Sequence, residues 1–325
     1  MLELKSQKEI FVRFQSLLAL LLMVVIFSIC AEGFFTKDNF WLVLRQVSVN
    51  TCLSVGMTLV ILTGGIDLSV GSILALSGAI MAGLYKNGLE LPAFNLFIGF
   101  SLFGAVTVGL MTGSFLGFFN GLMITRFKIP PFVATLAMLT IARGLTELWT
   151  GGAAITGLGE TFGFLGTGWF LGIPVQVWTS ALIVIIAVVL LRKTRFGRYV
   201  YAVGGNERAA TLSGLNVKRI KLLVYTLAGA LSAVGGLIVT SKLNSATPTA
   251  GDGYELDSIA AVVIGGTSLS GGKGSVVGTI LGALIIGVLN SGLIILRVPP
   301  FWQKVIKGFV ILLAVAIDKL NSKEQ

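Results

Sequence analysis

Histidine is absent from this chain of 325 residues, and cysteine occurs only twice. Histidine is the commonest general base and metal ligand near neutral pH, so its absence removes the usual core of a hydrolytic or metal centre. Cys30 and Cys52 lie in apolar segments without paired spacing, which indicates neither a disulfide framework nor a metal cluster. A phosphate-binding GxxxxGK[ST] loop is also missing. We therefore expect that the chain has no catalytic residue, binds no metal ion or cofactor, and is not an enzyme.

Charged residues are scarce as well, at 12% of the chain, whereas a soluble domain has roughly 25%. Apolar residues make up 55%. This composition places the chain in a lipid bilayer. At roughly 20 residues per span plus short loops, the length permits about ten transmembrane helices and no separate soluble domain. We expect an all-α, polytopic membrane protein in which residues 1–325 form a single transmembrane domain.

Ten apolar segments along the chain are the expected spans. They lie near residues 14–32, 45–63, 68–85, 94–125, 131–149, 175–191, 220–240, 255–268, 275–296 and 301–318. Lys5, Lys8 and Arg13 precede the first segment, an order that also occurs in signal peptides. Because no small-x-small cleavage site follows, we interpret the segment as a retained first helix.

The net charge of +10 indicates the direction of insertion. Lys and Arg sit in short loops and form no groove with exposed aromatic residues, so we expect no nucleic-acid partner. With the amino terminus inside, 16 of the 24 basic residues fall in inner segments, as the positive-inside rule requires. All five tryptophans then fall at outer ends of spans or in outer loops. We expect a bacterial inner-membrane protein with both termini in the cytoplasm.

The loop at residues 192–221 carries eight Lys or Arg residues and one acid. Within it, the string VGGNERAATLSGLNV predicts one short helix of about two turns. Asn206 is a good N-cap, Glu207 suits the positive end of the helix dipole, and Gly214 supplies the left-handed residue that ends the helix.

The residues inside this short helix suggest a surface for a cytosolic partner. Ala209 and Ala210 are expected to form a small, shallow face beside the charge of Arg208. A helix of this kind can seat in a groove of another protein and transmit force. An ordinary amphipathic connector is the alternative.

Glycine recurs at every fourth position of the fourth span, at Gly109, Gly113, Gly117 and Gly121. Such a stripe lets another helix approach closely where lipid provides no hydrophobic drive for association. It serves either static packing or a sliding surface between two access states.

Two glycine turns resemble each other, 64-GGIDLSVGS-72 and 265-GGTSLSGGKGS-275. Many transporters are built from internal repeats, and glycine-interrupted segments at matching positions can mark broken helices near a pathway. Independent origin of the two turns is the alternative. The resulting candidates for translocation or gating are Gly64, Gly65, Asp67, Ser69, Gly265 and Gly266.

Few ionisable residues fall inside the spans. Asp67 either serves the pathway, since a charge at membrane depth is costly and usually functional, or simply caps the third helix with Ser69 nearby. Arg143 and Glu147 lie one turn apart, which predicts an intrahelical pair. Because no cluster of Asp, Asn, Arg and Trp is evident at mid-membrane, we expect a pathway that does not hold its solute tightly.

The outer segment at residues 244–257 is rich in turn formers, hydroxyl groups and acids. It is either a surface for a soluble substrate-delivering protein or a plain loop.

Three strings resemble those of sugar-type ABC importer permeases, the membrane subunits of the ribose and related monosaccharide systems. They are 56-GMTLVILTGGIDLSVGS-72, 195-RFGRYVYAVGGNERAATLSGLNV-217 and 245-SATPTAGDGYELDSIAAVVIGGTSLSGGKGS-275. The resemblance covers nearly the whole chain. It implies a type II-like importer permease that pairs with a second copy, a cytoplasmic ABC ATPase and an extracytoplasmic sugar-binding protein.

The resemblance also implies that the helix from Asn206 to Gly214 docks on the ATPase and couples nucleotide-driven closure to alternating access. The chain departs from the glutamate-alanine-alanine pattern of other importers by placing Arg208 after Glu207. The alternative function is an ion-coupled secondary transporter of a small polar solute, for which Asp67, Glu147 and Asp257 are the candidate coupling residues.

Overall fold

The computed structural model describes residues 2–91 and 95–323. The helices are α1 (Leu2–Cys30), α2 (Lys37–Leu62), α3 (Val70–Asn87), α4 (Leu102–Arg126), α5 (Pro131–Thr150), α6 (Glu160–Thr167), α7 (Val175–Lys193), α8 (Arg195–Gly205), α9 (Glu207–Leu212), α10 (Val217–Leu243), α11 (Tyr254–Ile264), α12 (Val276–Ile295) and α13 (Pro300–Lys323). The strands are β1 (Leu89–Leu91), β2 (Leu96–Ile98), β3 (Ile155–Thr156), β4 (Trp169–Phe170), β5 (Ile173–Pro174) and β6 (Ser245–Ala246). The chain is mostly helical, as the sequence predicts.

Six helices in the described residues are long and apolar enough to cross a membrane, namely α2, α4, α5, α7, α10 and α12. Helices also occupy the other four predicted positions, as α1, α3, α11 and α13. However, α11 has only 11 residues. It rises about 16 Å, roughly half of the hydrocarbon core, so the prediction of a full crossing over 255–268 is wrong.

The fourth predicted span also differs from the structure at its beginning. Residues 96–98 form strand β2, which pairs antiparallel with β1. Helix α4 begins only at Leu102, where the hydroxyl of Ser101 accepts a hydrogen bond from the amide of Gly104. The long apolar run over 94–125 therefore contains a hairpin strand followed by a helix of 25 residues, which is ample for one crossing.

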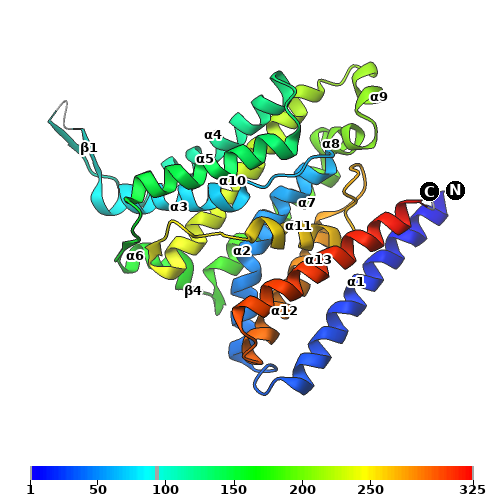
Figure 1. Ribbon diagram of the computed structural model, residues 1–325, viewed down its shortest axis with the longest axis horizontal. Helices are drawn as coiled ribbons and strands as arrows, with labels where there is room; N and C mark the ends of the chain where they lie inside the picture. Colours follow the sequence, from blue (N-terminus) through cyan, green and yellow to red (C-terminus); the bar gives the residue numbers. More distant parts are fainter. Residues whose placement is uncertain (1, 92–94, 324–325) are drawn as a thin grey trace.

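Helix α2 forms the centre of the molecule. Every residue from Val47 to Leu62 is buried, and the helix contacts α7, α10, α11 and α12. An α-helix that is apolar on all sides is stable only where other helices cover all of it. Figure 1 shows α3, α4 and α5 on one side of this centre and α1, α12 and α13 on the other.

The glycine stripe of α4 lies against its neighbours in the bundle. A Cβ atom at Gly113 or Gly117 would overlap the backbone of Gly229 or Tyr225 in α10, and one at Gly121 would lie 3.0 Å from the Cα of Leu222. Nearer the start of α4, Gly109 faces the side chain of Met81 in α3. The absence of side chains on this face allows α4 and α10 to pack with their backbones nearly touching.

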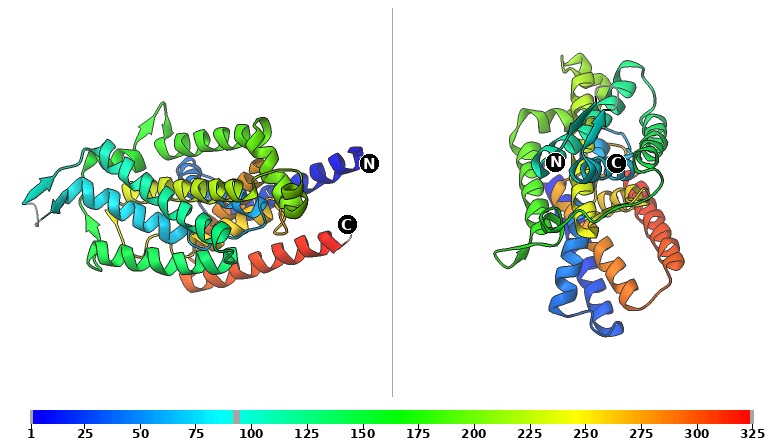
Figure 2. Two further views of the ribbon diagram at one scale, coloured as in Figure 1. Left: turned by 90° about the horizontal axis from the view of Figure 1, so that it is seen from above. Right: turned by 90° about the vertical axis from the view of Figure 1, so that its left-hand side faces the viewer.

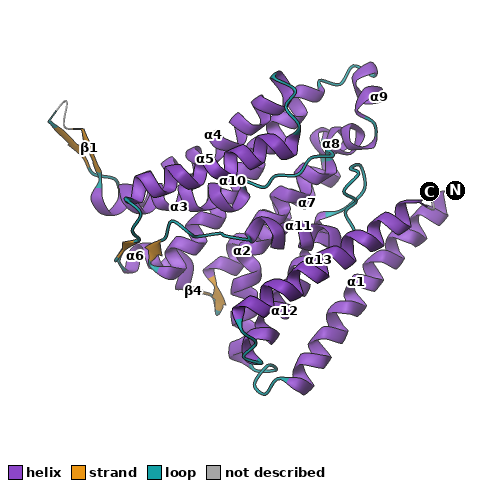
Figure 3. Cartoon of the chain, viewed as in Figure 1, coloured by secondary structure: helices purple, strands orange, loops and turns teal. Residues whose placement is uncertain are grey.

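The two ends of the bundle are built differently. The β1–β2, β3–β6 and β4–β5 pairs and helix α6 lie at one end, and α8 and α9 lie at the other. Figure 3 shows this segregation by secondary structure. In Figure 2, the beginning of α1 and the end of α13 lie toward the end that carries α8 and α9.

Candidate coupling and translocation elements

Helix α9 is the short capped helix that the sequence predicts. The side chain of Asn206 accepts a hydrogen bond from the amide of Ala209 at 2.9 Å. Gly214 has a left-handed φ of 82°, and the amide of Leu215 returns to the carbonyl oxygen of Ala210. These bonds satisfy backbone groups that a helix of only six residues otherwise leaves to water.

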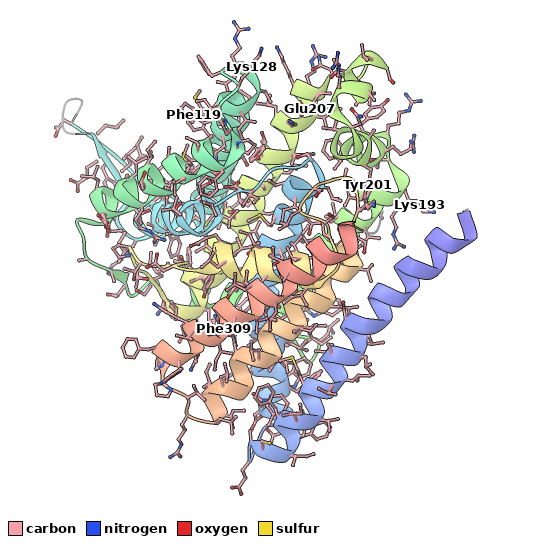
Figure 4. All side chains as sticks on the ribbon, turned by 45° about the vertical axis from the view of Figure 1, so that its right-hand side comes forward. Phe119, Lys128, Lys193, Tyr201, Glu207 and Phe309 are labelled. Atoms are coloured by element: carbon pink, nitrogen blue, oxygen red, sulfur yellow. The ribbon has the colours of Figure 1, made fainter. Side chains whose placement is uncertain are left out.

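An ion pair holds α9 against the base of α10. Lys221 Nζ lies 2.7 Å from Glu207 Oε2, with 58% of the glutamate side chain exposed. Exposed pairs of this kind contribute at most about 1 kcal/mol, so the pair orients the helix more than it stabilises it. Glu207 also lies at the border of the molecule in Figure 4, together with Lys128 and Lys193.

The expected alanine face of α9 is only half correct. Ala209 is exposed, but Ala210 is 6% exposed and packs in the core with Val217 and Ile220. On a helix, adjacent positions point about 100° apart, so Ala210 can turn toward the core while Ala209 stays at the surface. Every residue of α9 except Ala210 is exposed, and Leu212 is 81% exposed.

Helix α8, which precedes α9, was not expected as a separate element. Its buried side is formed by Gly197, Val200 and Val203. Near its end, a Cβ at Gly204 would overlap the carbonyl oxygen of Leu62, the last residue of α2. The hydroxyl of Tyr201 donates to the carbonyl oxygen of Gly274 at 2.9 Å. Thus α8 contacts the end of α2, directly before the first glycine turn, and the second glycine turn itself.

Both glycine turns end their helices with the same hydrogen-bond pattern. The amide of Gly64 donates to Ile61 and that of Gly65 to Val60. In the second turn, Gly266 donates to Val263 and Thr267 to Val262. These pairs of bonds define Schellman caps with Gly64 (φ 76°) and Gly266 (φ 82°) in the left-handed position.

The similarity of the two sequence strings pairs Gly64 with Gly265. The caps instead pair Gly64 with Gly266, one residue further along the chain. In the structure, Gly65 corresponds to Thr267 and Asp67 to Leu269. Any helix that ends at glycine can form this cap, so a shared cap carries no information about origin. Internal duplication stays a prediction.

Asp67 is fully buried in the first glycine turn. Its Oδ1 accepts hydrogen bonds from the amide of Ser69 at 2.9 Å and from the hydroxyl of Ser69 at 2.6 Å. Asn120 of α4 donates to the same hydroxyl at 2.9 Å. This network ties the start of α3 to α4. Among the described residues, Asp67 accepts only from Ser69, and the side chain of Ser69 makes no cap hydrogen bond to the first turn of α3. A gating role for Asp67 and Ser69 stays a prediction.

Arg143 does not pair with Glu147, so this expectation is wrong. Its guanidinium lies 2.9 Å from Asp252 and donates to the carbonyl oxygens of Pro248 and Ala250. A fork of five donors can satisfy several acceptors at once, and an intrahelical carboxylate offers fewer. Tertiary contacts therefore outweigh the local pair.

The segment between α10 and α11 is neither a plain outer loop nor fully exposed. Gly236 of α10 packs at the level of Leu74 and Gly78 in α3, but Gly251 contacts Gly71 near the beginning of α3. The segment therefore runs back along α3, from the level of Leu74 and Gly78 toward the beginning of that helix. Figure 1 shows it running from the neighbourhood of α6 to α11 at the centre of the molecule. It is a re-entrant segment, and Arg143 supplies donors for its carbonyl groups.

These elements belong to a polytopic helical protein, and comparison with known proteins decides the family. Residues 39–315 match the family model described as the permease component of branched-chain amino acid transport systems. The chain belongs to this permease family. No solved structure matches the chain.

Curated relatives of the permease cover almost its whole length. The ribose import permease protein RbsC of Bacillus subtilis is 53% identical over 94% of this chain and 92% of its own length. RbsC of Escherichia coli K12 is 48% identical over 95% of this chain and 94% of its own length. The D-allose transport system permease protein AlsC of the same strain is 38% identical over 94% of this chain and 90% of its own length. The resemblance to sugar-type importer permeases is confirmed, and the permease is a transport subunit rather than an enzyme.

Proposed function

We propose that the permease forms the transmembrane pathway of an ATP-driven importer for ribose or a related monosaccharide. The observation that carries this proposal is the similarity to ribose import permeases at 48–53% identity over more than nine tenths of the chain. Relatives with xylose, fructose and allose in their names are 34–38% identical. Ribose is therefore the first sugar to test.

Helix α9 is the proposed docking element for a cytoplasmic ABC ATPase. It is exposed, capped by Asn206 and anchored through the buried Ala210. Leu212 offers an apolar side chain to a groove in the partner, and Arg208 offers a charge. A helix with one buried anchor moves as a unit with the bundle when a partner pushes on it.

The path by which motion of α9 reaches the membrane runs through α8. Gly204 packs on the end of α2, and Tyr201 bonds to Gly274 in the loop before α12. Movement of α8 therefore displaces both glycine turns, including Gly265 and Gly266. We assign alternating access to a rearrangement of these two turns.

The proposed orientation places α8 and α9 in the cytoplasm. The basic residues at the ends of α4 and α7 belong to that end, which agrees with the positive-inside rule. They are Arg126, Lys128, Arg192 and Lys193, of which Figure 4 labels Lys128 and Lys193. Both termini are then cytoplasmic. At the opposite end, the strand pairs and α6 would meet the extracytoplasmic sugar-binding protein.

The assembly we propose contains two copies of the permease in the bacterial inner membrane. Each copy contributes ten membrane-embedded helices, of which α11 reaches only halfway. The exposed apolar side chains of α1, α4, α5, α7 and α13 face either lipid or the second copy. No nucleic acid takes part.

The coupling role is tested with one exposed and one buried alanine in the reconstituted importer. Ala209→Trp enlarges the exposed face and should abolish ribose uptake while the permease still inserts and folds. Ala210→Trp overfills the core and should lower the yield of folded protein. Normal ribose-stimulated ATP hydrolysis in Ala209→Trp would overturn docking through α9.

A further inference from the structure

A cavity with both polar and apolar lining lies between α2, α10, α11, α12 and α13, away from the glycine turns and α9. Its volume is about 180 Å³. A water molecule occupies roughly 30 Å³ of liquid, so the space suits one small solute of a few carbon atoms and is smaller than a typical drug-sized pocket of about 300–1,000 Å³. The cavity was not expected, because the sequence shows no cluster of polar residues at mid-membrane.

The position of the cavity follows from the half-length helix α11. Tyr254 and Asp257, in the first turn of α11, line it. Asn50, near the middle of α2, lines it from the other side. In transporters, solutes bind where a helix is interrupted at membrane depth, since the free helix end and the irregular backbone before it supply polar groups that lipid does not tolerate elsewhere.

One side chain in the wall lacks a partner. Asn290 of α12 is 4% exposed, and its Oδ1 has no hydrogen-bond partner among the described residues. A buried amide oxygen without a hydrogen bond costs about 1–3 kcal/mol. Asn290 lines the cavity, so a solute in the cavity is positioned to donate to this oxygen.

The other polar groups of the wall suit an uncharged solute. Gln46, Asn50 and Gln303 carry amides, which both donate and accept hydrogen bonds, as hydroxyl groups do. Asp257 and Lys307 form an ion pair at 2.9 Å, so their charges cancel within the wall. The remaining charge, Lys242, is on an exposed residue at the outer end of α10.

Apolar side chains complete the wall. Val49, Val239 and Ile294 line the cavity from three different helices. A solute with C–H groups on one side and hydroxyl groups on the other fits such a mixed lining, in which apolar groups provide most of the surface and a few polar groups fix orientation.

We propose that this cavity is a solute-binding site for a neutral polyhydroxy compound of monosaccharide size, with Asn50 and Asn290 as hydrogen-bonding residues. The inference rests on the proposed function for the choice of ribose as the probe. It deepens that function, because the permease then holds its sugar during passage and does not merely open a path for it.

The test measures binding by the full-length permease alone in lipid nanodiscs, with radiolabelled D-ribose as the probe. We expect saturable binding that unlabelled D-ribose displaces and ribose 5-phosphate does not. Asn290→Leu should weaken binding about tenfold, the effect of removing one or two hydrogen bonds. Ser291→Ala is the matched control, since Ser291 is buried on the same helix but bonds to Asn39 and does not line the cavity. It should change binding less than twofold.

Gln46→Leu is a second variant that keeps the test valid if Asn290→Leu fails to fold. Gln46 is only half-buried, so its substitution should leave folding intact and still weaken binding. Absence of saturable binding to the wild type, binding as tight as that of the wild type in both Asn290→Leu and Gln46→Leu, or displacement by ribose 5-phosphate as strong as by ribose would each overturn the proposal.

The outcomes separate this proposal from the proposed function. A reconstituted importer that takes up ribose while the isolated permease shows no saturable binding refutes the cavity alone. Binding of another neutral sugar, lost in Asn290→Leu, by a permease whose importer does not move ribose supports the cavity and refutes the ribose assignment.

Discussion

The backbone amide of Gly272 donates a hydrogen bond to the carbonyl oxygen of Leu62 at 3.0 Å. This bond joins the loop before α12 to the last residue of α2, although 210 positions separate them in the sequence. The end of α8 packs on the same carbonyl group through Gly204. Three segments of backbone therefore meet at one point between the proposed docking helix and the core.

Substitution at this meeting point should affect transport in a position-specific way. Gly204→Ala places a methyl group onto the Leu62 carbonyl oxygen and should push α8 away from α2. Gly205→Ala adds the same methyl group where no atom lies within 4 Å. We expect at least about a tenfold loss of sugar uptake per ATP hydrolysed in the first variant, as for loss of about 1.4 kcal/mol of coupling, and little change in the second. Equal behaviour of the two variants in a reconstituted importer would refute a relay through α8.

The glycine stripe of α4 predicts that an alanine substitution within it lowers the stability of the permease more than one at an open position. Gly117→Ala creates an overlap with the backbone of Tyr225 and should destabilise the permease by about 1–3 kcal/mol, as overpacking usually does. Gly144→Ala, on α5, meets nothing within 4 Å and is the control. Thermal unfolding in detergent, followed by fluorescence, measures the difference. An unchanged melting temperature for Gly117→Ala would show that α4 and α10 are not tightly packed in solution.

Arg143 should matter more than its acidic partner. Arg143→Gln removes donors from Pro248 and Ala250 in the re-entrant segment, and leaving such carbonyl groups unpaired costs about 1–3 kcal/mol. Asp252→Asn removes only an ion pair whose acid is 73% exposed, which is worth at most about 1 kcal/mol. Hydrogen exchange of residues 247–253 should accelerate strongly in the first variant and slightly in the second. The reverse order would contradict the described geometry.

The role of the N-cap residue of α9 can be tested by two substitutions of Asn206. Asn206→Ala removes the acceptor for the amide of Ala209 and should cost about 1 kcal/mol of helix stability, whereas Asn206→Asp retains an acceptor. We expect Asn206→Ala to reduce the affinity for the ATPase subunit and Asn206→Asp to preserve it, as measured by co-purification at graded concentrations. Similar affinity of both variants and the wild type would show that order in α9 is not needed for docking.

Local sequence patterns located most of the helices. Apolar runs marked every long helix, and the Asn206 and Gly214 signals marked α9, because these features depend on residues close in sequence. Helix α8 was missed since Arg195 and Arg198 mask the buried side formed by Val200 and Val203. The length of α11 could not be predicted, because it depends on where the re-entrant segment lies.

Long-range contacts explain what the sequence did not reveal about the site. Asn50, Asp257, Asn290 and Lys307 come from four helices and share no spacing pattern, so only the fold brings them to one cavity. The partner of Arg143 is also more than one hundred residues away. The local Arg143–Glu147 spacing was a valid signal that tertiary contacts outweighed.

Energy supply is the property that most directly separates an ATP-driven importer from every alternative. The decisive measurement is uptake of labelled ribose into sealed proteoliposomes that contain the permease with its cognate ATPase and receive the sugar-binding protein outside and ATP inside. We predict accumulation that requires all three additions and stops in the Ala209→Trp variant. Accumulation by the purified permease alone under a proton or sodium gradient, without any ATPase present, would contradict it.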